Sequence, residues 1–169
     1  MIMIINILGS IFIFSSCTIL GIYYGNKSER KIYILSSLKK SFMLLSYEIE
    51  YMANPLYTAF ENISKKTDGC IKEFYSFLAG ELYNNKDLKE SFKNIKNIKF
   101  IPNDILKEIS NLGGYLSSID KNIQLNSIYM LNSHIDIVLE NLYKVSTKEK
   151  KLYRGMGMLF GIFIIVLLI

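Results

Sequence analysis

The chain has 169 residues, of which 50% are hydrophobic and 21% are charged, and its formal net charge is +5. The mean hydropathy is nevertheless positive, at +0.23. This composition excludes a disordered chain, a collagen-like chain and a disulfide-stapled secreted miniprotein, and it disfavours a simple one-domain cytosolic enzyme. Every charged side chain lies between Lys27 and Arg154, so a polar middle region separates two apolar ends.

Residues 1–26 predict a transmembrane helix. Roughly twenty apolar residues at 1.5 Å each cross a hydrocarbon core of about 30 Å. Tyr23 and Tyr24 stand where interfacial aromatic side chains are expected. A cleaved signal peptide and a lipoprotein signal at Cys17 are the alternatives. The segment lacks the basic region that precedes such signals and an A-x-A-like cleavage site, so we expect an uncleaved anchor.

Residues 27–154 predict an all-α cytoplasmic bundle of about six helices, because apolar residues recur at three- and four-residue steps and no useful period-2 pattern appears. The expected helices begin at Lys31, at Pro55 with Asn54 as cap, after the turn at 67–69, at Asp87, at Pro102 and at Asp120. The expected apolar positions are Ile34, Leu35, Leu38, Phe42, Leu45, Ile49 and Met52 in the first helix and Ile123, Ile128, Leu131, Ile135, Val138, Leu142 and Val145 in the last.

Residues 155–169 predict a second, short transmembrane helix. A straight helix of this length covers about 22 Å, and Tyr153 and Arg154 can extend it through an interfacial ring and a snorkelling side chain. Gly157 and Gly161 form a G-x-x-x-G pattern that permits close helix packing. A buried C-terminal core helix is the alternative, and the absence of a polar face in the sequence disfavours it.

Basic residues flank both apolar ends on the side of the middle region. Lys27, Arg30 and Lys31 follow the first segment, and Lys151 and Arg154 precede the last. The positive-inside rule then predicts residues 27–154 in the cytoplasm and both termini across the membrane. The net charge is explained by this topology and by lipid head groups. It does not indicate nucleic-acid binding, because no basic stripe interleaves with an aromatic platform.

No constellation in the sequence predicts a catalytic site, a metal site or a cofactor. Glu48 and Glu50 stand at i,i+2 and do not share a helix face, which favours solvation or interhelical pairing over acid–base work. His134 lacks a nucleophile in a recognisable context. Gly113 and Gly114 lack the lysine and the preceding strand of a phosphate loop.

Three patterns together resemble a known family. The first is Ser46-Tyr47-Glu48-Ile49-Glu50-Tyr51 followed by Pro55-Leu56 and Ala59-Phe60; the second is Asp104-Ile105-Leu106 followed by Leu112-Gly113, Leu116, Asp120 and Gln124; the third is Leu152-Tyr153-Arg154 with Gly157 and Gly161. In this order and spacing they resemble the stage III sporulation protein AB family over essentially the whole chain. The chain departs from the family's pattern at Phe92, Ser117 and Ile119.

The resemblance implies a helical cytoplasmic domain similar to those of type II secretion F-family platform proteins. It implies a location in the outer forespore membrane, facing the mother-cell cytoplasm, and a place in the channel that joins mother cell and forespore. The implied partners are the stage III sporulation AA ATPase, other channel components and membrane lipids, with self-association left open.

Two interpretations of the family-matched residues remain. In one, Glu48, Glu50, Asp120 and Gln124 form an acidic or polar docking face for the ATPase, while Pro55, Gly113 and Leu116 shape turns and packing. In the other, all of them only shape a helical hairpin. At the level of the whole protein, we expect a non-enzymatic membrane platform. The alternative is a membrane-tethered regulatory or sensor module that acts without an ATPase.

Overall fold

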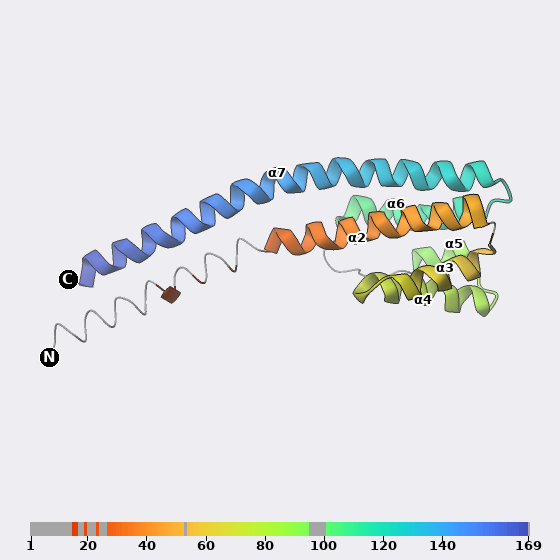
Figure 1. The fold of residues 1–169 in the computed structure, drawn as a ribbon, viewed down its shortest axis with the longest axis horizontal. Coiled ribbons are helices and arrows are strands. Elements are labelled where there is room, and N and C mark those ends of the chain that lie inside the picture. The colour runs from red at the N-terminus through yellow and green to blue at the C-terminus, as the bar shows by residue number, and fades with distance from the viewer. Residues whose placement is uncertain are drawn as a thin grey trace. The chain divides into compact units, whose positions relative to one another are not determined.

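The computed structural model describes residues 15–16, 19, 23, 27–52, 54–94 and 101–168. Within these residues every regular element is a helix, so the predicted all-α class is confirmed (Figure 1). The elements are α2 (Lys27–Tyr47), the π-helical turn η1 (Glu48–Met52), α3 (Leu56–Lys66), α4 (Gly69–Tyr83), α5 (Leu88–Lys93), α6 (Asn103–Leu116) and α7 (Lys121–Leu168).

The chain divides into two compact units, one formed by residues 1–32 with 140–169 and the other by residues 33–139. In the second unit α3 packs against α4, α5 packs against both α4 and α6, and η1 contacts α3. α2 and the first part of α7 run antiparallel (Figure 1). The contacts show this order: Lys39 pairs with Asp136 at 2.6 Å, whereas Glu50, farther along the chain, contacts Lys121 and Tyr129, which precede Asp136.

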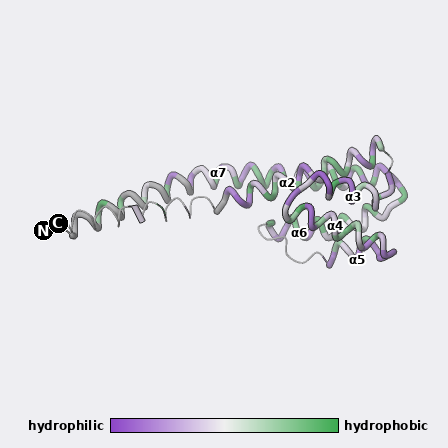
Figure 2. The backbone as a smooth tube through the Cα atoms, turned by 60° about the horizontal axis from the view of Figure 1, so that its bottom comes forward, coloured by the Kyte–Doolittle hydropathy of each residue, from purple (hydrophilic) through white to green (hydrophobic). Residues whose placement is uncertain are grey.

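Apolar residues at helical spacing hold this unit together. Hydrophobic and hydrophilic residues alternate along its helices (Figure 2), and the hydrophobic ones form the core. Five aromatic rings pack together near its centre, with ring centroids 4.9–6.5 Å apart. These rings belong to Phe42, Phe60, Phe74, Tyr75 and Phe92.

The expected apolar stripes are confirmed over most of their length. Every expected position of the first helix up to Ile49 is buried, and so are Ile105, Ile109, Leu112 and Leu116 of α6. Met52, Ile123 and Val145 were expected on the apolar faces and are 53%, 45% and 49% exposed. Met52 ends the π-helical turn, where the α-helical spacing no longer applies, and Leu125 takes the buried position at the start of α7.

The turn residues on either side of α4 and before α5 lie where the sequence predicts, whereas α2 begins at Lys27, four residues before the expected Lys31. Asn85 has φ 55° after α4, a left-handed conformation that asparagine tolerates, and Gly69 has φ 58° at the start of α4. Asp87 caps α5 by accepting a hydrogen bond from the backbone N–H of Lys89 at 3.1 Å. These local signals set the order and lengths of the short helices.

The structure describes little of the first predicted membrane segment and most of the second. Most of the first, residues 1–26, lies outside the described residues, and the second lies in the C-terminal part of α7. Within the described residues, none of the helices combines the length and the apolarity that a membrane crossing requires. The described side chains in this part of α7 include Leu152, Met156, Leu159 and Phe163, which are 43–68% exposed.

Candidate functional site

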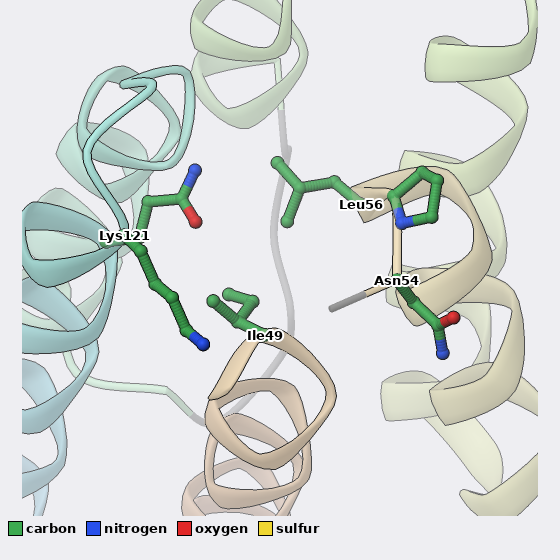
Figure 3. A pocket seen from close by; sticks show the side chains of 6 residues that line it. Ile49, Asn54, Leu56 and Lys121 are labelled. Carbon is green, nitrogen blue, oxygen red and sulfur yellow. The ribbon is translucent and has the colours of Figure 1, made fainter. Parts of the chain in front are cut away.

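Three elements of the second unit meet at one corner: η1, the start of α3 and the start of α7. They form the sides of an open pocket of about 290 Å³, lined by Ile49, Asn54, Pro55, Leu56, Lys121 and Gln124. Ile49 and Leu56 supply apolar side chains to its floor, and Lys121 extends across its edge (Figure 3). We call this arrangement the η1 corner.

Glu48 lies in the interior of the η1 corner, with 3% of its surface exposed. Its Oε2 accepts hydrogen bonds from the side-chain amides of Asn54 at 2.8 Å and Asn62 at 3.3 Å. Its Oε1 faces Lys66 Nζ at 3.4 Å. The structure therefore does not present this carboxylate on an exposed docking face; it links η1 to α3.

The pKa of Glu48 reflects two opposing effects. Burial raises the pKa, whereas the hydrogen bonds from Asn54, Asn62 and Lys66 and the charge of Lys66 lower it, and the net direction is downward from the usual value of 4.5. The carboxylate is thus ionised at neutral pH. A buried anion with three donors fixes the geometry of the link between η1 and α3.

Glu50 is half-buried and faces α7. Its backbone carbonyl accepts a hydrogen bond from Lys121 Nζ at 2.5 Å, and its Oε2 accepts one from the Tyr129 hydroxyl at 3.2 Å. The two glutamates of η1 therefore make separate interhelical contacts, as their i,i+2 spacing predicts. Within the described residues no lysine or arginine forms an ion pair with the Glu50 carboxylate.

Three tyrosines with large exposed surfaces lie close to Glu50 in the sequence or contact it. Tyr47 and Tyr51 stack at a tilt with ring centroids 5.3 Å apart, and Tyr47, Tyr51 and Tyr129 are 47%, 69% and 48% exposed. Partial desolvation, the charge and hydrogen bond of Glu50, and the proximity of Tyr51 raise the pKa of Tyr129. The tyrosine hydroxyl therefore stays protonated and donates to the carboxylate.

Asp120 and Gln124 shape the turn between α6 and α7. Asp120 Oδ1 accepts the backbone N–H of Asn122 at 2.8 Å, which is the contact of a helix N-cap. Gln124 Nε2 donates to the carbonyls of Leu116 at 2.9 Å and Ser118 at 2.7 Å. Both side chains thus satisfy backbone groups at the helix ends, and Gln124 also lines the pocket.

The start of α3 differs from the expectation by one residue. α3 begins at Leu56, and the carbonyl of Pro55 accepts the first helical hydrogen bond, from Ala59 N–H at 3.0 Å. Pro55 therefore occupies the cap position predicted for Asn54. The Asn54 side chain points away from the pocket (Figure 3) and donates to Glu48, because the buried carboxylate needs donors more than the exposed helix end does.

Gly113 and Leu116 of α6 have roles in packing. Gly113 lies against α5, and Leu116 is buried. A Cβ atom on Gly113 would lie 2.7 Å from Phe92 Cβ and 2.8 Å from the Leu88 carbonyl oxygen. Leu116 is 1% exposed. Ser117, one of the departures from the family pattern, donates its hydroxyl to the Gly113 carbonyl at 2.8 Å and ends α6.

The C-terminal residues singled out in the sequence, Tyr153, Arg154, Gly157 and Gly161, belong to the backbone of α7. Their side-chain surroundings lie outside what the structure describes. Their expected roles in anchoring and helix packing therefore stay predictions.

His134 lies between two carboxylates of α6. Its Nδ1 is 2.6 Å from Glu108 Oε1, and its Nε2 is 3.7 Å from Asp104 Oδ2. The contacts join α6 to α7. Among the described residues no group of three histidine, cysteine, aspartate or glutamate side chains could hold a metal ion.

Sequence reasoning missed the π-helical turn and the grouping of tyrosines at it. A signal for the second existed: Tyr47 lies two residues after the buried Leu45 and Tyr51 two residues after the buried Ile49, so both fall outside the apolar stripe of this helix. No sequence signal placed Tyr129 next to them, because that contact joins residues separated by 79 positions.

Comparison with known proteins agrees with the motifs described above. Residues 6–169 match the family model of stage III sporulation protein AB. The stage III sporulation protein AB of Bacillus subtilis (strain 168) is 21% identical over 169 residues, which cover 97% of this chain and 99% of that protein. No solved structure matches the chain. The chain belongs to the stage III sporulation protein AB family.

Proposed function

We propose that the chain is a non-enzymatic membrane platform of the sporulation channel between mother cell and forespore, and that its helical region docks a cytoplasmic secretion-type ATPase. Family membership supports a role in sporulation. The similarity of the family's cytoplasmic domain to type II secretion F-family platforms supports the docking role, and the family resemblance implies the stage III sporulation AA ATPase as partner.

The observation that carries the docking proposal is the η1 corner. It combines an open pocket, lined in part by the apolar Ile49 and Leu56, with three exposed tyrosines, of which Tyr129 donates to the Glu50 carboxylate; that carboxylate has no ion-pair partner among the described residues. Tyrosine is enriched in protein interfaces and among the few residues that supply most of their binding energy. π-Helical turns occur often at functional sites, and η1 forms one wall of this corner.

The membrane part of the proposal rests on the two apolar ends of the sequence. We propose that residues 1–26 and 155–169 cross the outer forespore membrane, with residues 27–154 in the mother-cell cytoplasm. In α7, Leu152, Met156, Leu159 and Phe163 follow one another at steps of four, three and four residues and are exposed. This spacing forms one apolar helix face, which suits contact with lipid or with another membrane helix.

Binding of the ATPase to the full-length chain tests the docking proposal. The chain, purified in detergent and immobilised, should bind the purified stage III sporulation AA ATPase with a saturable, micromolar or tighter Kd. Absence of binding at ATPase concentrations up to about 100 µM, in the presence and absence of nucleotide, would contradict the proposed platform role. It would leave the regulatory or sensor module as the better interpretation.

A further inference from the structure

The exposed part of the η1 corner has a composition that selects its ligand. Tyr47 and Tyr51 stack on each other and are exposed, Tyr51 lies near Tyr129, and the Tyr129 hydroxyl donates to one oxygen of the Glu50 carboxylate from α7. We call these four residues the tyrosine–glutamate surface. Glu50 Oε2 is engaged, whereas Oε1 makes no hydrogen bond within the described residues.

Among the described residues, the Glu50 carboxylate forms no ion pair. Lys121 Nζ contacts the backbone carbonyl of Glu50 and not its carboxylate. Glu48, the other acid of η1, lies inside and is already paired with Lys66. Glu50 is therefore the one acidic side chain of η1 that is available to a partner.

A planar cation is the ligand that such a surface fits. A guanidinium group stacks on tyrosine rings through cation–π contact and forms directed hydrogen bonds to a carboxylate. An ammonium group supplies the charge without the planar stacking. An apolar side chain would cover the rings but would bury the Glu50 carboxylate without a partner, which costs free energy.

We propose that the tyrosine–glutamate surface binds an arginine side chain of a protein partner. This inference rests on the proposed function, since it names the chemistry by which the docked partner is held. The arginine stacks on Tyr47 or Tyr51 and donates to Glu50, while Tyr129 keeps the carboxylate oriented. None of these four residues lines the pocket of the η1 corner, so the pocket is not needed for this step.

The first experiment tests the recognition chemistry without the ATPase. The full-length chain is labelled with 3-fluorotyrosine in detergent, and the fluorine resonances of Tyr47, Tyr51 and Tyr129 are assigned from single tyrosine-to-phenylalanine variants. Acetyl-arginine amide should shift these three resonances saturably. Acetyl-lysine amide should bind at least about threefold more weakly, because it cannot stack as a plane.

Two variants and a matched control complete this arm. Glu50→Gln keeps an oxygen for Tyr129 but removes the charge, and it should weaken arginine binding by about tenfold, the loss of a charged hydrogen bond. Tyr51→Ser should weaken it by about threefold. Glu73→Gln removes an exposed carboxylate from α4 and should leave binding unchanged. Equal shifts by lysine, no shift by arginine, or an unchanged Glu50→Gln variant would each overturn the proposal.

The second experiment measures the Kd of the same variants for the stage III sporulation AA ATPase. Weakening by Glu50→Gln and Tyr51→Ser but not by Glu73→Gln supports arginine recognition as the mode of docking. If the wild-type chain binds the ATPase and none of the variants changes the Kd, docking stands and the arginine contact is overturned. If the wild-type chain does not bind the ATPase but binds arginine as expected, the platform role fails and another arginine-bearing partner is required.

Discussion

A buried carboxylate is stable only where donors replace the water it has lost, and Glu48 shows how this chain meets that condition. Two amides and one lysine surround it, and they come from the link after η1 and from α3. The same carboxylate that the sequence suggested as a docking residue thus holds the corner in shape. Its neighbour Glu50, two positions along, remains accessible because η1 turns the two side chains to different sides.

Removing the charge of Glu48 should destabilise the fold. In Glu48→Gln the new amide group must face Asn54 and Asn62 or Lys66, all of which are donors, so we expect a loss of about 1–3 kcal/mol at pH 7. Thermal or urea unfolding of the full-length chain in detergent, followed by circular dichroism, measures it. Glu61→Gln, which alters an exposed i,i+4 pair with Lys65, should change stability by less than about 0.5 kcal/mol.

The loss should depend on pH in a defined direction. The folded pKa of Glu48 lies below its ordinary value of 4.5, so its contribution is complete above that value and declines as the pH falls through the folded pKa. The stability difference between the wild type and Glu48→Gln should therefore be constant from pH 8 to about pH 6 and shrink below about pH 4.5. A difference that grows with acidity would contradict the lowered pKa.

The role of Asp120 can be divided into cap and charge. Asp120→Ala removes the acceptor for Asn122 N–H and should cost about 1 kcal/mol, whereas Asp120→Asn keeps an oxygen there and should stay within a few tenths of the wild type. Unfolding curves of the two variants give both values. An equal loss in both would mean that the negative charge near the start of α7, and not the cap, supplies the stability.

At the scale of elements, the sequence determines helices well and their ends less well. The stripe Leu38, Phe42 and Leu45 predicts a buried helix face, and α2 buries it completely. Asp87 and Asn85 mark a helix start and a helix end because their side chains tolerate or satisfy special backbone conformations. The π-helical turn escaped prediction because it depends on contacts with α3 and α7, which no local pattern encodes.

The same reason limits prediction of the candidate site. Glu48, Glu50 and Gln124 were singled out by the family pattern, and the structure brings them together at the η1 corner. Periodicity alone cannot separate their roles. Burial of Glu48 and partial burial of Glu50 follow from which side of η1 meets α3, and that is set by tertiary packing.

The contact between α5 and α6 can be tested by substituting Gly113, and the neighbouring Gly114 supplies the control. Gly113→Ala places a Cβ 2.8 Å from a backbone oxygen of α5, which cannot rotate away, so the helices must separate at a cost of about 1–3 kcal/mol. Gly114→Ala meets only the Lys89 side chain at 3.9 Å and should stabilise α6 by up to about 1 kcal/mol. Thermal midpoints of the two variants should move in opposite directions. Similar midpoints would show that α5 yields to the extra methyl group.

At the scale of the whole molecule, the proposed topology makes a prediction about compartments. Alkaline phosphatase, which is active only outside the cytoplasm, should be active when fused to either terminus and inactive when inserted after Lys93, at the end of α5. A cytoplasmic fluorescent reporter should give the reverse pattern. An active phosphatase after Lys93, or an inactive one at the C-terminus, would contradict the proposed crossing by residues 155–169.

The two proposed spans also separate a platform from a tethered sensor. A platform uses its membrane helices for assembly, so Gly157→Leu with Gly161→Leu should reduce sporulation even where the protein level is unchanged. Replacement of both spans by an unrelated tether should have the same effect. Normal spore counts with the unrelated tether would favour the sensor, for which only attachment to the membrane matters.

The π-helical turn also indicates where the chain can tolerate the insertion or deletion of a residue. A π turn holds one residue more than an α turn, so η1 stores an extra residue between two packed segments. Deletion of Tyr51 from η1 should let the segment relax to an α-helical turn while α2 and α3 keep their registers. A deletion within Leu38–Leu45 would rotate every later core residue by about 100°. Among the described helices, η1 is therefore the place where single-residue insertions and deletions between relatives should be found.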